Sequence, residues 1–391
     1  MRQYLSYLKG DNVIWIITLL MLVFSLVSVY SFVPILVKIE GGTPIKYLYK
    51  HAIYVLLGFF VMFWLHKKDP KYIGQFSKFG YALAIALLIF TLFFGAKVND
   101  AGRWIRIPFV GLTFQSSDFA KLALIIYISK LLSVKKDVLD SWSKGFWPVF
   151  VPVLIIFLLI VKDNFSTAAL LMLICLVLMF IGKVPISKLM VIGAAVITLS
   201  FLAVLAHKAL PDLNLLPRYQ TWENRIFNKI ENPDDVMSNS QSLNAELAIH
   251  NGSILGQGVG DGKLKEDIPE AYADFYYASF VEEFGLVSAV FLILLYMILL
   301  YRIIRIALRS EKLFETYVCL GIGILILTQA SINMLVCTGV FPVTGQNMPL
   351  LAMGGSALIM TCVAIGVVQS IAKTQVLAEH KDEPVNTLAQ I

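Results

Sequence analysis

Long apolar stretches separated by polar connections make up most of this chain. Most of them are close to the roughly 20 apolar residues that an α-helix needs to cross hydrocarbon. The stretches cover residues 13–37, 48–66, 79–96, 118–133, 147–161, 167–182, 187–208, 274–301, 314–337 and 349–372. The alternation typical of transmembrane β-strands is absent, so the backbone must satisfy its hydrogen bonds within helices. We therefore expect an all-α membrane bundle of about ten transmembrane helices.

The composition agrees with this interpretation. Of the 391 residues, 58% are hydrophobic and 15% are charged, and the mean hydropathy of +0.77 is too high for a soluble domain. The first apolar run is too long for the core of a cleavable signal peptide, so we interpret it as the first span. We divide the chain into a transmembrane domain, residues 1–375, and a short cytoplasmic tail, residues 376–391.

Lysine and arginine are distributed unevenly between the connections. With the N-terminus in the cytoplasm, the inner side carries Arg2, Lys9, Lys67, Lys68, Lys71, Lys78, Lys135, Lys136, Lys144, Lys183, Lys188, Arg302, Arg305, Arg309, Lys312, Lys373 and Lys381. The short outer connections carry Lys38, Lys46, Lys50, Lys97, Arg103, Arg106 and Lys162. The positive-inside rule then places both termini in the cytoplasm and the long polar loop, about residues 209–273, on the outer side.

Several other classes of function are disfavoured. The net charge of +6 is explained by anchoring at the inner leaflet, so we expect no nucleic-acid partner. The cysteines lie in or beside spans without paired spacing, which indicates neither a disulfide framework nor a zinc site. The glycine run at 256–262 follows no predicted strand, so tight turns explain it better than a nucleotide site does.

The long outer loop contains two segments with helical character. Residues 218–232 combine Trp222 and Phe227 with Arg225 at helical spacing, which fits an amphipathic helix on the membrane interface or an ordinary packed loop helix. Residues 241–249 form a second candidate helix.

The first polar motif that carries chemistry is residues 99–106, between the third and fourth spans. Arg103 and Arg106 could hold a phosphate through charge-assisted hydrogen bonds while Trp104 lies at the lipid boundary. The alternative is a simple aromatic anchor with solvated arginines.

Two further motifs stand at the starts of spans. Asp118 and Lys121 are three residues apart, so they can pair on one helix face, either as a helix start with a snorkelling lysine or as part of a substrate site. Residues 162–167 form a very short polar turn, whose side chains either face a shared cavity or, as we expect, cap the helix that follows.

The acidic junction at 268–285 is the strongest candidate for catalysis. Pro269 can begin a helix, Glu270 would lie in its first turn, and Asp274 one turn further on the same face. A partly desolvated carboxylate there could act as a general base or hold a divalent cation against a diphosphate. Glu282 and Glu283 lie deeper and are open to a functional or a paired structural role.

The last motif, residues 341–356, breaks the chain before the tenth predicted span. Pro342, Gly345, Pro349, Gly354 and Gly355 lie within it. Close approach of helices is the simplest explanation for these residues.

In this order, the motifs resemble those of the SEDS family of bacterial cell-wall proteins, the family of FtsW, RodA and SpoVE, over nearly the whole chain. Residues 102–105 are similar to its GRWI motif, and residues 115–121 to its QPSEFAK motif. Segments 225–226, 241–243, 255–260, 269–285 and 342–356 are similar to further family positions.

The chain departs from the family pattern at several positions. Ser116 and Asp118 replace a proline and a glutamate, and Asn164 stands where the family has an aspartate. Tyr272 replaces a histidine, whereas Asp274 keeps the family's carboxylate.

The resemblance implies a peptidoglycan glycosyltransferase that polymerises lipid II at the outer face of the cytoplasmic membrane. Asp274 is then the expected catalytic base or metal ligand, with a divalent cation such as Mg²⁺ or Mn²⁺ as an open question. The expected substrate-binding residues are Arg103, Trp104, Lys121, Arg225 and Glu270.

The resemblance also implies partners. These are membrane lipid, a class B penicillin-binding protein with transpeptidase activity, and other divisome proteins, since the overall pattern favours division over elongation. A lipid II flippase, an elongation polymerase of the RodA type and a recruiting scaffold are the alternatives.

Overall fold

The computed structural model describes residues 8–98, 101–106, 112–209, 236–268 and 270–382. Its longer helices are α2 (Asn12–Glu40), α3 (Pro44–His66), α4 (Pro70–Phe94), α5 (Ser116–Val134), α6 (Trp147–Val161), α7 (Phe165–Ile181), α8 (Ile186–Ala209), α11 (Val236–Gly252), α12 (Tyr276–Arg309), α13 (Leu313–Cys337) and α14 (Gly355–Asp382). Short helical turns occupy Lys136–Val138, Trp142–Phe146 and Leu264–Glu266. The expectation of an all-α membrane fold is confirmed.

Within the described residues, eight helices are long and apolar enough to cross a membrane. The other two expected spans correspond to α5, which carries Asp118, Lys121 and Lys130, and to α7, which has 17 residues. Both are helices at the expected places, while the number of spans stays a prediction. The helix expected at 241–249 is confirmed as part of α11, and the proposed helix at 218–232, with Arg225, lies outside the described residues.

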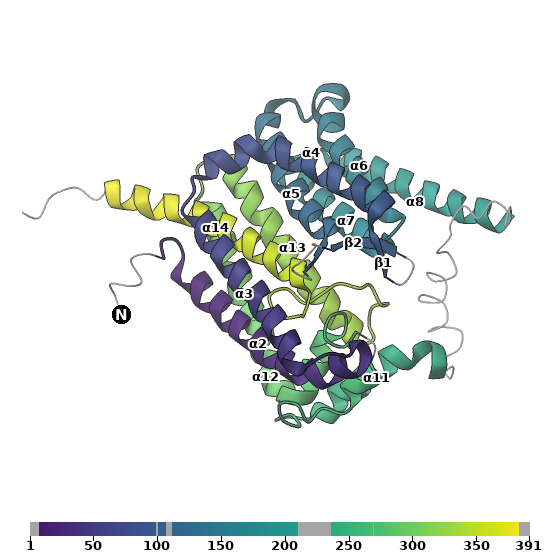
Figure 1. Ribbon diagram of the computed structural model, residues 1–391. Coiled ribbons are helices and arrows are strands. Elements are labelled where there is room, and N and C mark those ends of the chain that lie inside the picture. Colours follow the sequence, from purple (N-terminus) through teal and green to yellow (C-terminus); the bar gives the residue numbers. More distant parts are fainter. Residues whose placement is uncertain (1–7, 99–100, 107–111, 210–235, 269, 383–391) are drawn as a thin grey trace, which may run out of the picture.

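The bundle has two hydrophobic cores that share α5 and α13. One core joins α2, α3, α12 and α14, and the other joins α4, α6 and α7. Figure 1 shows the second group at one side of the molecule, with α8 projecting away from it. In the most apolar part of α8, only 6% of the residues are buried inside the protein, so the apolar side chains of this helix are available to lipid.

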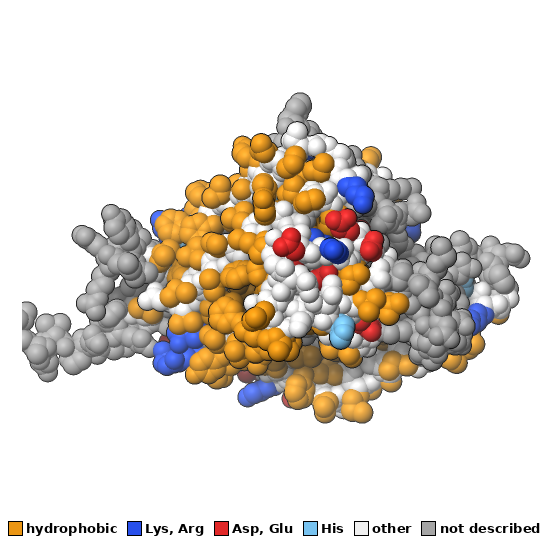
Figure 2. Space-filling model, turned by 90° about the horizontal axis from the view of Figure 1, so that it is seen from below, with side chains coloured by type: hydrophobic (Ala, Val, Ile, Leu, Met, Phe, Trp, Pro, Cys, Tyr) orange, Lys and Arg blue, Asp and Glu red, His pale blue; other side chains and the backbone are white. Residues whose placement is uncertain are grey.

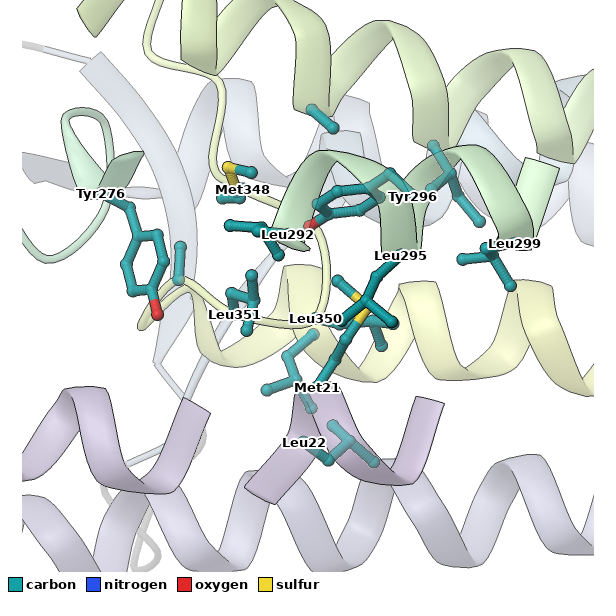
Figure 3. Close-up of a cluster of buried hydrophobic side chains, with 14 of the residues drawn as sticks. Met21, Leu22, Tyr276, Leu292, Leu295, Tyr296, Leu299, Met348, Leu350 and Leu351 are labelled. Carbon is teal, nitrogen blue, oxygen red and sulfur yellow. The ribbon is translucent and has the colours of Figure 1, made fainter. Parts of the chain in front are cut away.

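Irregular backbone is enclosed within the first core. Residues Leu350 and Leu351 pack between α2 and α12, beside Met21 and Leu295 (Figure 3). The Tyr296 hydroxyl donates a hydrogen bond of 2.5 Å to the carbonyl of Pro349. Non-helical backbone at membrane depth requires such internal partners, because lipid offers none.

The tenth span therefore begins later than the predicted residue 349. Residues 342–348 have no regular secondary structure, and α14 starts at Gly355. A Cβ atom on Gly355 would lie 2.5 Å from the ring of Tyr54 in α3. Glycine at this position lets α14 begin against α3, in agreement with the close approach predicted for the motif. At its other end α14 continues to Asp382, so part of the predicted tail is helical.

A small antiparallel sheet precedes α5 and was not predicted. Its strands, β1 (Ala96–Val98), β2 (Ala101–Arg106) and β3 (Thr113–Gln115), lie in the order β1-β2-β3. The Tyr54 hydroxyl accepts a hydrogen bond from the Thr113 amide at 2.8 Å. Trp104 faces Gln115 across the β2–β3 pair, which brings the expected phosphate-binding motif to the start of α5.

The helix predicted to begin at Pro269 begins at Tyr276 instead. Residues 270–275 form turns, and the helical path is interrupted at Gly285, whose φ of 77° and ψ of 175° are not helical. The 34 residues of α12 would span about 50 Å, more than the roughly 30 Å of hydrocarbon. The part before Gly285 thus belongs to the loop end of the molecule, and the span runs from Gly285 toward Arg309.

A polar cavity beside Asp274

A cavity of about 330 Å³ opens among α3, α5, α7, the sheet and the turn before α12. The cavity is lined by residues from all five of the motifs described above. They include Trp104, Asp118, Lys121, Asn164, Glu270, Asp274 and Gly345. Their separation along the chain shows that the cavity is a product of the tertiary fold.

Asp274 is held in a single turn that precedes α12. Its amide donates to the carbonyl of Glu270 at 3.0 Å, and Glu270 has a positive φ of 55°. The carbonyl of Tyr272 accepts a hydrogen bond of 2.9 Å from the amide of Met353, which fixes the turn to the segment before α14. The Asp274 side chain is half-buried and lines the cavity.

Asn333 of α13 forms hydrogen bonds that hold the backbone around Asp274 in place. Its amide nitrogen donates to the carbonyl of Asp274 at 2.9 Å and to that of Gln346 at 2.8 Å. Its amide oxygen accepts from the backbone of Tyr277 at 3.3 Å. A Cβ atom on Gly345 would lie 3.4 Å from the Asp274 carboxylate, so residue 345 is a close neighbour of that group. One buried side chain thus ties together three segments that form the cavity wall.

The predicted pairing of Asp118 and Lys121 is confirmed. Their charged atoms are 2.9 Å apart, and the two side chains are 5% and 8% exposed. The Ser356 hydroxyl donates to the other Asp118 oxygen at 2.9 Å, and it accepts from the Gln115 amide at 3.1 Å. The pair therefore joins the starts of α5 and α14, and buried charges require this kind of compensation.

Part of the cavity lining consists of uncharged polar residues, among them Asn164, Thr167 and Gln346. Asn164 accepts a hydrogen bond from the Thr167 amide at 3.1 Å, so the predicted capping of α7 is confirmed. The Gln346 side chain donates to the Thr167 hydroxyl at 2.7 Å. Hydroxyl and amide side chains in the lining can donate to and accept from a polar ligand such as a sugar.

Two of the expected substrate contacts cannot be placed in the cavity. The backbone of Arg103 lies in β2 next to Trp104, but its side chain is outside the described part of the structure. Arg225 lies wholly outside it. Both roles stay predictions.

Glu282 and Glu283 bind the loop and do not line the cavity. One oxygen of Glu282 accepts from the amides of Lys263 and Leu264 at 3.1 and 3.0 Å. Glu283 forms an ion pair with the buried Lys265, and it also accepts a hydrogen bond from Ser31 of α2. The sequence left open a functional role or a paired structural role for these two glutamates. Their contacts support the paired structural role.

The glycine-rich turn packs directly on this part of α12, and the expectation of tight turns is confirmed. A Cβ atom on Gly256 would lie 2.2 Å from the carbonyl of Glu283, and one on Gly285 would lie 2.4 Å from the amide of Gly256. Gly256, Gly258 and Gly260 all have positive φ. Figure 2 shows the molecule from below, where acidic side chains lie together with basic ones in an area bordered by hydrophobic side chains.

The cavity is polar and contains charges of both signs. Its described lining includes three carboxylates, Asp118, Glu270 and Asp274, and two lysines, Lys50 and Lys121. Among the described residues, no group of three or more His, Cys, Asp and Glu side chains could hold a metal ion. A cation here would need a substrate or water to complete its coordination.

Sequence reasoning missed Lys50 and Asn333 as parts of this site. Lys50 was counted only as an outer-side charge, and nothing local distinguishes it from the other lysines. Asn333 did carry a signal, because a polar amide inside an apolar span is a marker of function or of buried hydrogen bonding.

The fold and the cavity define a class: a polytopic membrane protein with a carboxylate-containing polar chamber between its helices. The chain belongs to the FtsW/RodA/SpoVE family of cell cycle proteins, whose model matches residues 11–376. It is 31% identical over 370 residues to a probable peptidoglycan glycosyltransferase FtsW of Geobacter sulfurreducens, covering 93% of this chain and 95% of that protein. It is 29% identical over 368 residues to stage V sporulation protein E of Bacillus subtilis, covering 93% and 97%.

Solved structures agree on the fold. A chain of a peptidoglycan synthase complex that coordinates polymerization and crosslinking matches with a TM-score of 0.73 and 23% identity, covering 94% of this chain and 98% of that one. The rod shape determining protein RodA of Thermus thermophilus matches with a TM-score of 0.66 and 21% identity, covering 94% and 97%.

Proposed function

We propose that this protein is a peptidoglycan glycosyltransferase that polymerises lipid II into glycan strands during septal wall synthesis. Relatives that match it over almost their whole length are named probable peptidoglycan glycosyltransferase FtsW. The observation that carries the proposal is the placement of Asp274 in a polar cavity between the helices.

The reaction requires removal of one proton. The 4-hydroxyl of the acceptor sugar attacks the anomeric carbon of the donor, and the bond from that carbon to the diphosphate breaks. Asp274 is the proposed general base that takes the hydroxyl proton, and undecaprenyl diphosphate leaves with the bonding electrons. Asn333 supports this role because its hydrogen bonds hold the backbone of Asp274.

The leaving diphosphate needs positive charge. Lys50 and Lys121 are the two described cations that line the cavity, and Asp118 holds Lys121 in position. Arg103 and Arg225 are proposed as further contacts, and Trp104 and Glu270 as cavity-lining contacts to lipid and sugar. Preorganised cations stabilise charge that develops on a leaving group.

A divalent cation is compatible with this set of donors. Mg²⁺ is commonly held by one or two carboxylates together with phosphate oxygens and water, and Asp274 and Glu270 line the same cavity. When bound, such an ion would supply additional positive charge to the diphosphate.

We place the cavity at the outer face of the bacterial cytoplasmic membrane. The lysine and arginine distribution supports this orientation. A class B penicillin-binding protein is the proposed partner, because crosslinking must follow polymerisation. Other divisome proteins are proposed as further partners, because relatives of this chain are named FtsW.

The decisive test uses the purified full-length chain in detergent with lipid II. Glycan polymer, resolved by length on a gel, is the expected product, and addition of the transpeptidase partner should increase its yield. Translocation of lipid II across vesicles without any polymer, with or without the partner, would contradict the proposal in favour of a flippase.

A further inference from the structure

The glycine-rich turn, residues 252–260, lies against the point where the helical path of α12 is interrupted. Before the interruption, the carbonyl of Glu282 accepts a hydrogen bond of 2.9 Å from the amide of Gln257. The carbonyl of Glu283 accepts one of 3.0 Å from the amide of Gly258. Two carbonyls of the helix are therefore bonded to the turn.

Two amides that follow the interruption also bond to the turn. Leu286 donates to the carbonyl of Ser253 at 3.0 Å, and Val287 donates to the carbonyl of Ile254 at 3.3 Å. In a continuous α-helix, these amides would donate to the carbonyls four residues earlier. The turn thus provides partners for backbone groups on both sides of the break, and it is a fixed part of the helical bundle.

The contacts of Glu283 show how deep this turn lies. Its side chain accepts a hydrogen bond from the hydroxyl of Ser31 in α2. The apolar span of α2 runs from Asn12 to Lys38, so Ser31 lies about 10 Å from the end at Lys38. Val287 is one turn further along α12 than Glu283. The turn therefore lies beside the apolar part of α2 and not beyond its end.

The tip of the turn exposes large apolar side chains at this depth. Ile254 is 63% exposed and Leu255 is 83% exposed. Beside them on α12, Leu286 and Val287 are 53% and 59% exposed. Residues 252–260 contain no charged side chain. The apolar surface of the α12 span therefore continues onto the turn without a charge between them.

A later part of the same loop lies at the polar end of α2. Glu266 forms an ion pair of 3.7 Å with Lys38, and the two side chains are 51% and 77% exposed. Such exposed pairs are typical of a surface in contact with water. The loop therefore has one part level with the apolar spans and another part level with their polar end.

We propose that the glycine-rich turn inserts Ile254 and Leu255 among the upper acyl chains of membrane lipid, in the leaflet nearest the Asp274 cavity. Large apolar side chains are stabilised by removal from water, and lipid is the medium that surrounds the adjoining exposed face of α12. Irregular backbone at this depth needs partners inside the protein, and α12 supplies four of them. This contact with lipid does not depend on the proposed polymerase activity.

The test places a fluorescent dye on the turn in the full-length protein, reconstituted into phosphatidylcholine vesicles. The dye is attached to the variant Leu255→Cys. The four native cysteines are fully buried, and the wild-type chain treated in the same way measures any labelling of them. The dye should lose most of its fluorescence when the lipid carries a spin label near the top of the acyl chain, and little when iodide is added to the water.

Two further positions calibrate the measurement. Glu266→Cys is the matched control, because it lies in the same loop and its side chain is half exposed. Its dye should be quenched strongly by iodide and weakly by the spin-labelled lipid. Leu294→Cys, at a position 52% exposed on the α12 span, is the reference for a dye in lipid. The dye at 255 should behave like the dye at 294.

Three results would overturn the proposal. Equal iodide quenching at 255 and 266 would place the tip in water. Quenching at 255 by both reagents to the same extent would place the tip among the headgroups. Protection from both reagents would show that protein covers the tip. If Leu255→Cys lowers the melting temperature, Ile254→Cys replaces it, and the same pattern of quenching decides the question.

Discussion

The side-chain amide of Asn333 lies 2.9 Å from the backbone carbonyl of Asp274, across a gap of 59 residues in sequence. The same nitrogen reaches the carbonyl of Gln346. Helix α13 therefore positions the backbone of Asp274, the proposed base, through Asn333. The same helix also contributes Gln329, one turn before Asn333, to the cavity lining.

Asn333→Leu should reduce polymerisation by about 100-fold or more. The change leaves buried carbonyls without a donor, and a misplacement of about 1 Å in a catalytic group can cost roughly 10²-fold in rate. Initial rates on lipid II at matched protein amounts measure this effect. Thr328→Val is the control, because the Thr328 hydroxyl bonds only within α13, to Ile324, in the described contacts. A similar loss in both variants would count against a positioning role.

Asp274→Asn should abolish polymer formation while the protein still inserts and melts normally. General-base catalysis typically contributes about 10²–10⁴-fold, and the amide cannot accept the proton. Glu270→Gln is the matched comparison, since it is an exposed carboxylate on the same turn, and its loss should be much smaller. Wild-type polymer yield from Asp274→Asn would reject the assignment of the base.

Asp118→Asn and Lys121→Gln should each destabilise the protein, by about 3–5 kcal/mol, because each leaves a buried charge without its partner. The double variant should recover most of the melting temperature. Activity distinguishes the two roles of the pair. If Lys121 contacts the diphosphate, the double variant stays inactive although it is stable, and recovery of both properties would make the pair purely structural.

Gly256→Ala should impair polymerisation far more than Gly260→Ala. Both glycines have positive φ, 86° and 91°, so backbone strain is similar in the two variants. The added methyl at 256 would lie 2.2 Å from the Glu283 carbonyl, whereas nothing lies within 4 Å at 260. We expect a loss of about 10²-fold at 256, measured as glycan product at matched membrane level. Equal effects at the two positions would mean that packing against α12 is unimportant.

Local relationships could be predicted from the sequence. Apolar runs predicted a helix at each of the ten places, because hydrocarbon dictates helix length and internal hydrogen bonding. The bounds were less accurate, since α4 begins at Pro70 and not at residue 79, and α14 extends from Gly355 to Asp382 and not from 349 to 372. The three-residue spacing along one helix predicted the pairing of Asp118 with Lys121, and the short polar turn predicted the helix cap that Asn164 forms. The late start of α12 was missed, because nothing local reveals that residues 270–275 are held by turns and by contacts to the segment before α14.

By itself, the sequence determined that this chain is a helical membrane protein and which residue types carry its chemistry, since hydropathy and one-turn spacing act over a few residues. Only the tertiary structure decided that Asn333 holds Asp274, that Glu282 and Glu283 bind the loop, and that Lys50 shares the cavity. Each of these contacts joins segments brought together by burial of apolar helix faces, and burial is not directional. The partners of a buried polar group are therefore fixed by how the helices pack.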